Sequence, residues 1–190
     1  MTSDVSPWLL RWPAAAPAGA TALDLACGSG RHLRYLAAKG LHVTGVDRDS
    51  AATAPLQALA EIITADIEAG PWPLAGRQFD LVLVTNYLWR PLLPQIIASV
   101  APGGWLIYET FAHGQQSIGR PARADFLLQP GELLHACADL RVVGYEDGFE
   151  SAPDEISPAA VNGRFVQRVA AVRAASEDEG VFQRYALPRP

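Results

Sequence analysis

The chain contains few cysteines, and their spacing indicates neither a metal site nor a set of disulfides. Cys27 and Cys137 are the only two, and they form neither a metal-binding motif nor a dense disulfide framework. We therefore assign no metal ligands and expect a cytoplasmic protein, because thiols stay reduced there. No stretch approaches the ~20 apolar residues that span a bilayer, so we expect no membrane partner.

An excess of positive charge is also absent. The formal net charge is -5 and the pI is near 5.3, which leaves no general footprint for a polyanion and disfavours nucleic acid as a partner. With 190 residues, 49% of them hydrophobic, the chain can bury one good core and is too short for two comfortable domains. The composition defines no oligomeric state.

The most informative segment is residues 23–32, which read Leu-Asp-Leu-Ala-Cys-Gly-Ser-Gly-Arg-His. A short apolar strand ends at a glycine-rich turn, and helix-forming residues follow from Leu33 to Lys39. Gly28 and Gly30 have no Cβ, so the loop can adopt dihedrals closed to other residues and its amides can approach a ligand closely. We expect a ligand to lie against this turn, although a glycine pair alone also fits a simple tight turn.

This loop lacks the features of two common nucleotide motifs. A dinucleotide fold requires G-x-G-x-x-G/A, and the third small residue is here Leu33, which weakens the pyrophosphate interpretation. A phosphate loop requires Gly-Lys-Ser/Thr, whereas Arg31 and His32 follow Gly30. Asp24, just before the loop, would repel phosphate and could pair with a cationic amino-acid group.

Two more carboxylates follow strand-like segments. Asp47 lies about 20 residues beyond the first loop glycine, the spacing at which a carboxylate binds ribose hydroxyls. Asp66 follows residues 61–65 and precedes Ile67, a pair that suits the edge and the face of an adenine. Each aspartate alone also fits a helix cap or a solvated loop. Together they favour an adenosine-containing ligand.

The glycine turn and the two later acidic strand ends belong to a set of five segments between residues 21 and 112. They are Asp24–Gly30, Gly45–Asp47, Ala65–Ile67, Phe79–Val84 and Ala101–Leu106. In this order they resemble the class I S-adenosylmethionine-dependent methyltransferases. The resemblance implies S-adenosyl-L-methionine as cofactor, with Asp24 and the loop amides at its methionine end, Asp47 at the ribose, and Asp66 with Ile67 at the adenine. The cofactor-binding residues we assign are Asp24, Ala26, Gly28, Gly30, Asp47, Arg48, Asp66, Ile67 and Asn86.

A closer resemblance is to small bacterial methyltransferases of the tellurite-resistance type. It is carried by Asn86–Leu92, Tyr108–Phe111 and Gly119–Pro121, and it adds little about the substrate.

The alternation of elements predicts an α/β fold with parallel strands joined by helical crossovers. The family resemblance further implies a Rossmann-like, seven-stranded mixed sheet whose last strand is antiparallel, with helices on both faces. We expect strands at 21–26, 41–46, 61–65, 79–84, 104–110, 140–149 and 162–174, and helices at 30–39, 50–60, 91–100 and 130–137.

The domain boundaries follow from the same pattern. The methyltransferase domain is expected to cover 21–175, with an N-terminal segment at 1–20 and a flexible tail at 176–190. The N-terminal segment has no basic leading region and is interrupted by prolines, which argues against a signal peptide. We expect a short helix over Trp8 to Trp12, which either covers the cofactor cleft or serves as a hydrophobic anchor.

Catalytic candidates are sought beyond the carboxyl ends of the fourth and fifth strands, because ligands of open α/β sheets bind there. We assign His113 as the first candidate for a general base and Glu109 as the second, with Tyr87 and Asn86 orienting the acceptor through hydrogen bonds. The alternatives are an exposed loop histidine for His113 and, for Glu109, a structural carboxylate paired with an arginine.

Two further absences narrow the methyl acceptor. Family members that methylate amide or adenine nitrogens usually carry Asn/Asp-Pro-Pro-Tyr/Phe after the fourth strand, where this chain has Asn86-Tyr87-Leu88-Trp89. A cytosine-C5 enzyme would need a nucleophilic cysteine there. We therefore predict direct methyl transfer to a small-molecule substrate, which requires alignment and no covalent intermediate. The alternatives are a catalytically silent S-adenosylmethionine-binding module and a nicotinamide-dependent oxidoreductase, against which Leu33 and Asp24 argue.

Overall fold

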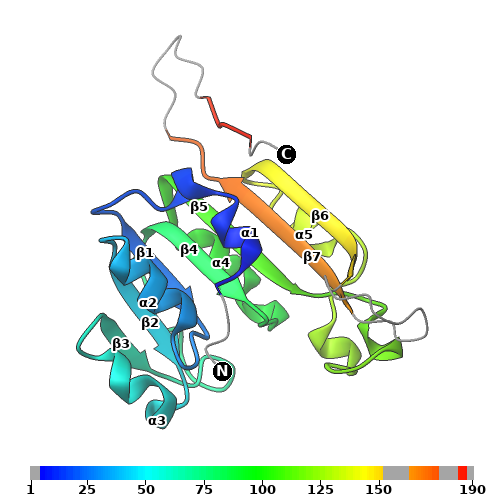
Figure 1. Ribbon diagram of the computed structural model, residues 1–190, viewed down its shortest axis with the longest axis horizontal. Helices are drawn as coiled ribbons and strands as arrows, with labels where there is room; N and C mark the ends of the chain where they lie inside the picture. Colours follow the sequence, from blue (N-terminus) through cyan, green and yellow to red (C-terminus); the bar gives the residue numbers. More distant parts are fainter. Residues whose placement is uncertain (1–4, 152–162, 176–183, 188–190) are drawn as a thin grey trace.

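The computed structural model describes residues 5–151, 163–175 and 184–187, and they build one seven-stranded sheet in the order β3-β2-β1-β4-β5-β7-β6 (Figure 1). Its strands are β1 (Thr21–Leu25), β2 (His42–Asp47), β3 (Glu61–Thr64), β4 (Phe79–Thr85), β5 (Val100–Phe111), β6 (Arg141–Ser151) and β7 (Gly163–Val172). Strands β1 to β5 pair in parallel, and β7 runs antiparallel to both β5 and β6. The predicted mixed sheet with an antiparallel last strand is confirmed.

Short helices cover both faces of this sheet, as predicted. The α-helices are α1 (Pro7–Leu10), α2 (Arg31–Ala38), α3 (Ser50–Thr53), α4 (Leu93–Ala98) and α5 (Glu132–Ala136), and the 3-10 helices are η1 (Pro13–Ala15), η2 (Ala54–Leu56), η3 (Arg90–Leu92), η4 (Gln115–Ser117) and η5 (Ala124–Phe126). Apolar side chains of α1, α2 and η2 share one core cluster, and those of α4 and α5 share the other. The two clusters lie on opposite faces because successive strand residues point to opposite sides.

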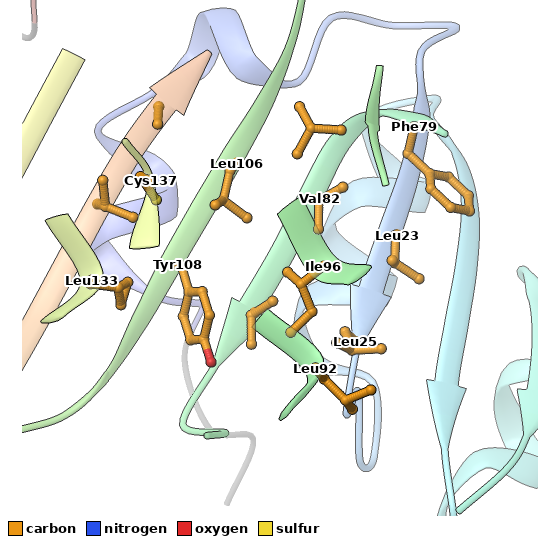
Figure 2. Packing of buried hydrophobic residues seen from close by; sticks show 14 of the residues in the cluster. Leu23, Leu25, Phe79, Val82, Leu92, Ile96, Leu106, Tyr108, Leu133 and Cys137 are labelled. Atoms are coloured by element: carbon orange, nitrogen blue, oxygen red, sulfur yellow. The ribbon is translucent and has the colours of Figure 1, made fainter. Parts of the chain in front are cut away.

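The central strands are apolar on both faces, as expected for parallel strands covered by helices. Figure 2 shows the cluster on the α4 and α5 side, where Leu23 of β1, Val82 of β4 and Leu106 of β5 line the sheet and Ile96 of α4 packs over them. Tyr108 of β5 is also buried in this cluster, and its hydroxyl donates a hydrogen bond to the Tyr87 carbonyl oxygen at 2.9 Å. That bond holds the loop after β4 close to β5.

Two predicted helices are shorter in the structure than the sequence pattern indicated. The helix expected at 50–60 is reduced to α3 and the 3-10 turn η2, because Pro55 has no amide hydrogen to continue an α-helix. The helix expected at 91–100 starts as η3 and becomes α-helical only over Leu93–Ala98. It ends there because β5 begins at Val100, four residues before its predicted start, where Val100 pairs with Phe79 of β4.

The N-terminal segment forms a shorter helix than the one expected over Trp8 to Trp12. Helix α1 covers Pro7–Leu10. Ser6 caps its N-terminus, and the Ser6 hydroxyl accepts hydrogen bonds from the Trp8 and Leu9 amides. The side chains of Trp8 and Trp12 are almost fully buried. Of the predicted tail, residues 176–183 and 188–190 lie outside the described residues, and the ring of Tyr185 packs edge-on against Trp105.

Candidate active site

The glycine-rich turn after β1 adopts the strained conformation that its sequence suggested. Ala26, Gly28 and Gly30 all have positive φ values, of 54°, 53° and 76°. The Gly28 amide donates to Asp47 Oδ2 at 2.8 Å, which connects the turn to the end of β2. A Cβ on Gly28 would meet nothing within 4 Å, so the turn presents its backbone to open space. A ligand can therefore approach this backbone closely.

Asp24, the last polar residue before the turn, is almost fully buried. It is 1% exposed, and its Oδ2 atom has no hydrogen-bond partner among the described residues. Burial raises the pKa of Asp24 to about 7, while a backbone hydrogen bond from Leu33 and the charge of Arg31 act in the opposite direction. A buried carboxylate with a free oxygen is a good partner for a cationic group of a ligand.

A pocket of about 220 Å³ opens beside this turn. It is lined by Ala26, Asp47, Arg48, Ala65, Asp66, Ile67, Glu68 and Tyr87, which come from the carboxyl ends of β1 to β4. Six of these residues, all but Glu68 and Ala65, had been assigned to the site from the sequence. Ala65 and Glu68 were missed, although both flank the assigned pair Asp66 and Ile67.

The two pocket aspartates are already part of local hydrogen-bond networks. Asp47 accepts the Gly28 amide on one oxygen and the Asp49 amide on the other. Asp66 Oδ1 accepts the amides of Glu68 and Ala69, which shapes the turn that follows β3. A carboxylate offers about four acceptor positions, so both side chains keep capacity for ligand hydroxyl or amino groups.

Tyr87 contributes to the pocket wall beside the carboxylates. Its hydroxyl is buried and lies beside the Glu68 carboxylate. Burial, the charge of Glu68 and a hydrogen bond to the Glu68 side chain raise the pKa of Tyr87 well above its usual range. The hydroxyl therefore stays protonated at neutral pH and can donate a hydrogen bond to a ligand in the pocket.

The structure also explains why Leu33 replaces the small residue of the dinucleotide motif. A Cβ built on Gly45 of β2 would lie 2.7 Å from Leu33 Cδ1. The close contact between helix and strand is thus made by a glycine on the strand instead of one on the helix. The turn keeps its geometry with a large apolar residue in α2.

The other predicted catalytic residues lie around the ends of β4 and β5. Asn86 is exposed, has a φ of 53° and does not line the pocket. His113 is exposed, and its Nδ1 lies 3.4 Å from Gln116 Nε2. Glu109 is 1% exposed, with its Oε2 atom 3.5 Å from both Arg164 and Arg168. The arginine-paired arrangement considered for Glu109 is the one that the structure contains.

Two negative findings concern the described part of the chain. Within it, no three His, Cys, Asp or Glu residues are grouped so that they could hold a metal ion. None of the helices described is long and apolar enough to cross a membrane.

Comparison with known proteins supports the family resemblance. Residues 22–104 match the family model of a methyltransferase domain, over the strands and turn that form the pocket. This part of the chain is similar to the class I methyltransferases. The resemblance drawn from the sequence motifs is thereby confirmed, and the family's fold agrees with the sheet order observed here.

Among curated proteins, this chain is similar to the ubiquinone biosynthesis O-methyltransferase of Paraburkholderia phytofirmans. The two are 32% identical over 127 residues, which cover 60% of this chain and 55% of the relative. The corresponding enzyme of Burkholderia multivorans is 33% identical over 127 residues, with the same coverage. The chain thus spans about half the length of the curated relatives it matches.

Among solved structures, TehB from Haemophilus influenzae has the same fold. The TM-score is 0.69 at 20% sequence identity, with 91% of this chain and 63% of TehB covered. A TehB-like S-adenosylmethionine-dependent methyltransferase from Corynebacterium glutamicum gives 0.62 at 20% identity, with 90% and 89% covered.

Proposed function

We propose that this protein transfers a methyl group from S-adenosylmethionine to a small molecule in the cytoplasm. The observation that carries the proposal is the pocket at the carboxyl ends of β1 to β4, which combines the carboxylates of Asp47, Asp66 and Glu68 with the apolar side chain of Ile67. The match of residues 22–104 to the family model of a methyltransferase domain supports it. The activity for which the curated relatives are named, O-methylation in ubiquinone biosynthesis, supports a small organic acceptor.

The residues present fit S-adenosylmethionine at this site. Asp47 and Asp66 would accept the ribose hydroxyls and the adenine amino group, and Ile67 would pack against the adenine face. Asp24, with its unpartnered buried oxygen, would accept the ammonium group of the methionine end. When bound, the cofactor supplies a methyl group activated by a sulfonium.

The protein's task in such a reaction is alignment and exclusion of water. Direct displacement requires the acceptor atom, the methyl carbon and the leaving sulfur to lie in line, and holding them so can supply much of the rate. Tyr87 and Asn86, at the end of β4, are proposed to orient the acceptor. A hydroxyl acceptor must also lose a proton, and exposed His113 is the proposed base because Glu109 is already paired with arginines.

The test is cofactor binding, followed by turnover. Isothermal titration should give binding of S-adenosylmethionine and none of NAD, and Asp47→Ala should weaken that binding at least ~10-fold through lost charge-assisted hydrogen bonds. Asp139→Ala is the matched control, because Asp139 is exposed and lies outside the pocket. Release of S-adenosylhomocysteine is then measured with a panel of small hydroxyl, thiol and amine acceptors.

The outcomes separate the candidate functions. Absence of S-adenosylmethionine binding would refute the proposal, and binding without turnover for any acceptor would favour the catalytically silent module. Binding of NAD and not of S-adenosylmethionine would favour the nicotinamide-dependent oxidoreductase as the function.

A further inference from the structure

A buried histidine outside the pocket connects its own helix, α2, to the N-terminal segment and to the end of β4. His32, in the first turn of α2, is 2% exposed. Its Nε2 atom accepts a hydrogen bond from the Ser6 amide at 3.1 Å, and its Nδ1 atom lies 3.3 Å from Thr85 Oγ1. A backbone amide can only donate, so Nε2 must be unprotonated and Nδ1 carries the hydrogen. The ring therefore donates to the Thr85 hydroxyl.

His32 and its partner Thr85 each lie next to a part of the proposed methyl-transfer site, and its partner Ser6 belongs to the N-terminal segment. Thr85 is the last residue of β4, directly before Asn86 and Tyr87. His32 itself follows Gly30 by two residues and precedes Leu33, whose amide bonds to Asp24. Ser6 starts α1 by capping it with its side chain. One imidazole thus fixes the spacing between the glycine turn and the end of β4, and anchors the N-terminal segment to both.

We propose that His32 is a positioning residue of the S-adenosylmethionine site, holding the glycine turn of α2 at a fixed distance from the end of β4 through Thr85. The inference rests on the proposed function and adds a residue that touches neither the cofactor nor the acceptor. Burial lowers the pKa of His32 to about 4, which agrees with a ring that stays neutral and keeps accepting from Ser6. The neighbouring Arg31 charge acts in the same direction.

Three substitutions of His32 and one of Thr85 separate the two hydrogen bonds. His32→Leu removes both. His32→Asn keeps a donor near the Nδ1 position, toward Thr85, and His32→Gln keeps an acceptor near the Nε2 position, toward Ser6. Thr85→Val removes the hydroxyl with little change in shape. His135→Leu, at an exposed position of α5, is the control.

The measurement is the dissociation constant of S-adenosylmethionine, taken well below each variant's unfolding temperature. We expect His32→Leu and Thr85→Val each to weaken binding about 10-fold, within the usual range of coupling between sites. His32→Asn should recover most of the affinity, and His32→Gln should recover little. The double variant should bind about as weakly as either single one, because both changes break the same connection.

A merely structural histidine would give a different pattern. It would lower the unfolding temperature of the variants and leave their dissociation constants within about twofold of the wild type, and this result would overturn the proposal. Additive losses of about 100-fold in the double variant would overturn it as well. A wild-type protein that binds no S-adenosylmethionine would overturn the proposed function together with this inference, whereas normal binding by folded His32→Leu would overturn this inference alone.

Discussion

At the scale of single residues, Asp24 combines burial with an unpaired oxygen. The carboxyl group accepts a hydrogen bond from the Leu33 amide, while its Oδ2 atom has no partner among the described residues. A buried charge without full pairing costs folding free energy, because the lost hydration is not replaced. A cationic group of a ligand would offset part of this cost.

The substitution Asp24→Asn tests this cost through its pH dependence. The pKa of Asp24 is raised to about 7 from 3.8, so its folded form favours the proton and stability is lost as pH rises from 3.8 through 7. Asparagine has no such charge. We expect the unfolding free energy of the variant, relative to wild type, to increase on the order of 3 kcal/mol between pH 4 and pH 8.

Urea unfolding at both pH values measures this difference, and titration with S-adenosylmethionine should show weaker binding by the same variant. A stability difference that does not change with pH would mean that Asp24 has an ordinary pKa. The control is Asp139→Asn, at an exposed position.

At the scale of elements, the turn between β1 and α2 uses its two glycines differently. Both have positive φ, but a Cβ on Gly28 would point into open space, whereas a Cβ on Gly30 would lie 2.5 Å from Leu56 Cδ1 of η2. Gly28 thus leaves room for a ligand, and Gly30 leaves room for the packing of η2. Their sequence motif does not distinguish these tasks.

Alanine substitutions at the two glycines should therefore have different consequences. Gly28→Ala should cost about 1–2 kcal/mol for its left-handed backbone and lose most cofactor affinity. Gly30→Ala should cost about 1–3 kcal/mol more, because its Cβ overlaps Leu56. Urea unfolding and cofactor titration measure the two effects.

Leu56→Ala provides the check on this interpretation. Added to Gly30→Ala, it should cost less than it does in the wild type, because it removes the overlapping atoms. Equal stability of the two glycine variants would contradict the assignment of Gly30 to packing.

At the scale of the whole molecule, the N-terminal segment completes the core over the second half of the sheet. Trp8 Nε1 donates to the Val169 carbonyl oxygen of β7 at 3.1 Å, and its ring contacts Trp12 at 5.4 Å between centroids. Trp12 in turn packs against Trp105 of β5, over the space left by Gly144 of β6. Trp105 and Val169, more than 90 positions away in the sequence, are thus shielded from solvent by the N-terminal segment.

Removal of the Trp8 side chain should therefore destabilise the whole domain. We expect Trp8→Ala to reduce the unfolding free energy by about 3–5 kcal/mol and Trp8→Phe by about 1–2 kcal/mol, since phenylalanine loses mainly the hydrogen bond. Leu10→Ala, at a position 48% exposed in the same helix, should change it by less than about 0.5 kcal/mol. Similar losses for Trp8→Ala and Leu10→Ala, measured by urea unfolding, would show that α1 is not part of the core.

Much of this architecture could be predicted because it depends on local patterns. Short apolar strands, the glycine turn and the acids after β2 and β3 predict a parallel α/β sheet and most of the pocket wall, since a parallel sheet brings strand ends to one edge. The seven strands and the antiparallel last strand were implied by the family resemblance. Asp47 could be placed from its spacing to the first loop glycine, and Ile67 from its position after Asp66 at the end of a strand. The helix at 50–60 was misjudged because one proline outweighed the surrounding helix formers.

The sequence by itself determined which strands form, their approximate limits and which of their ends line the pocket, because neighbouring residues settle these properties. Only the tertiary structure decided which side chains pair with residues far away in the sequence. It paired Glu109 with Arg164 and Arg168 and left Asp24 Oδ2 without a partner. It also placed His32 between Ser6 and Thr85, residues 26 positions before and 53 positions after it. Such contacts depend on which strands become neighbours and which face a side chain takes, and no local pattern encodes both.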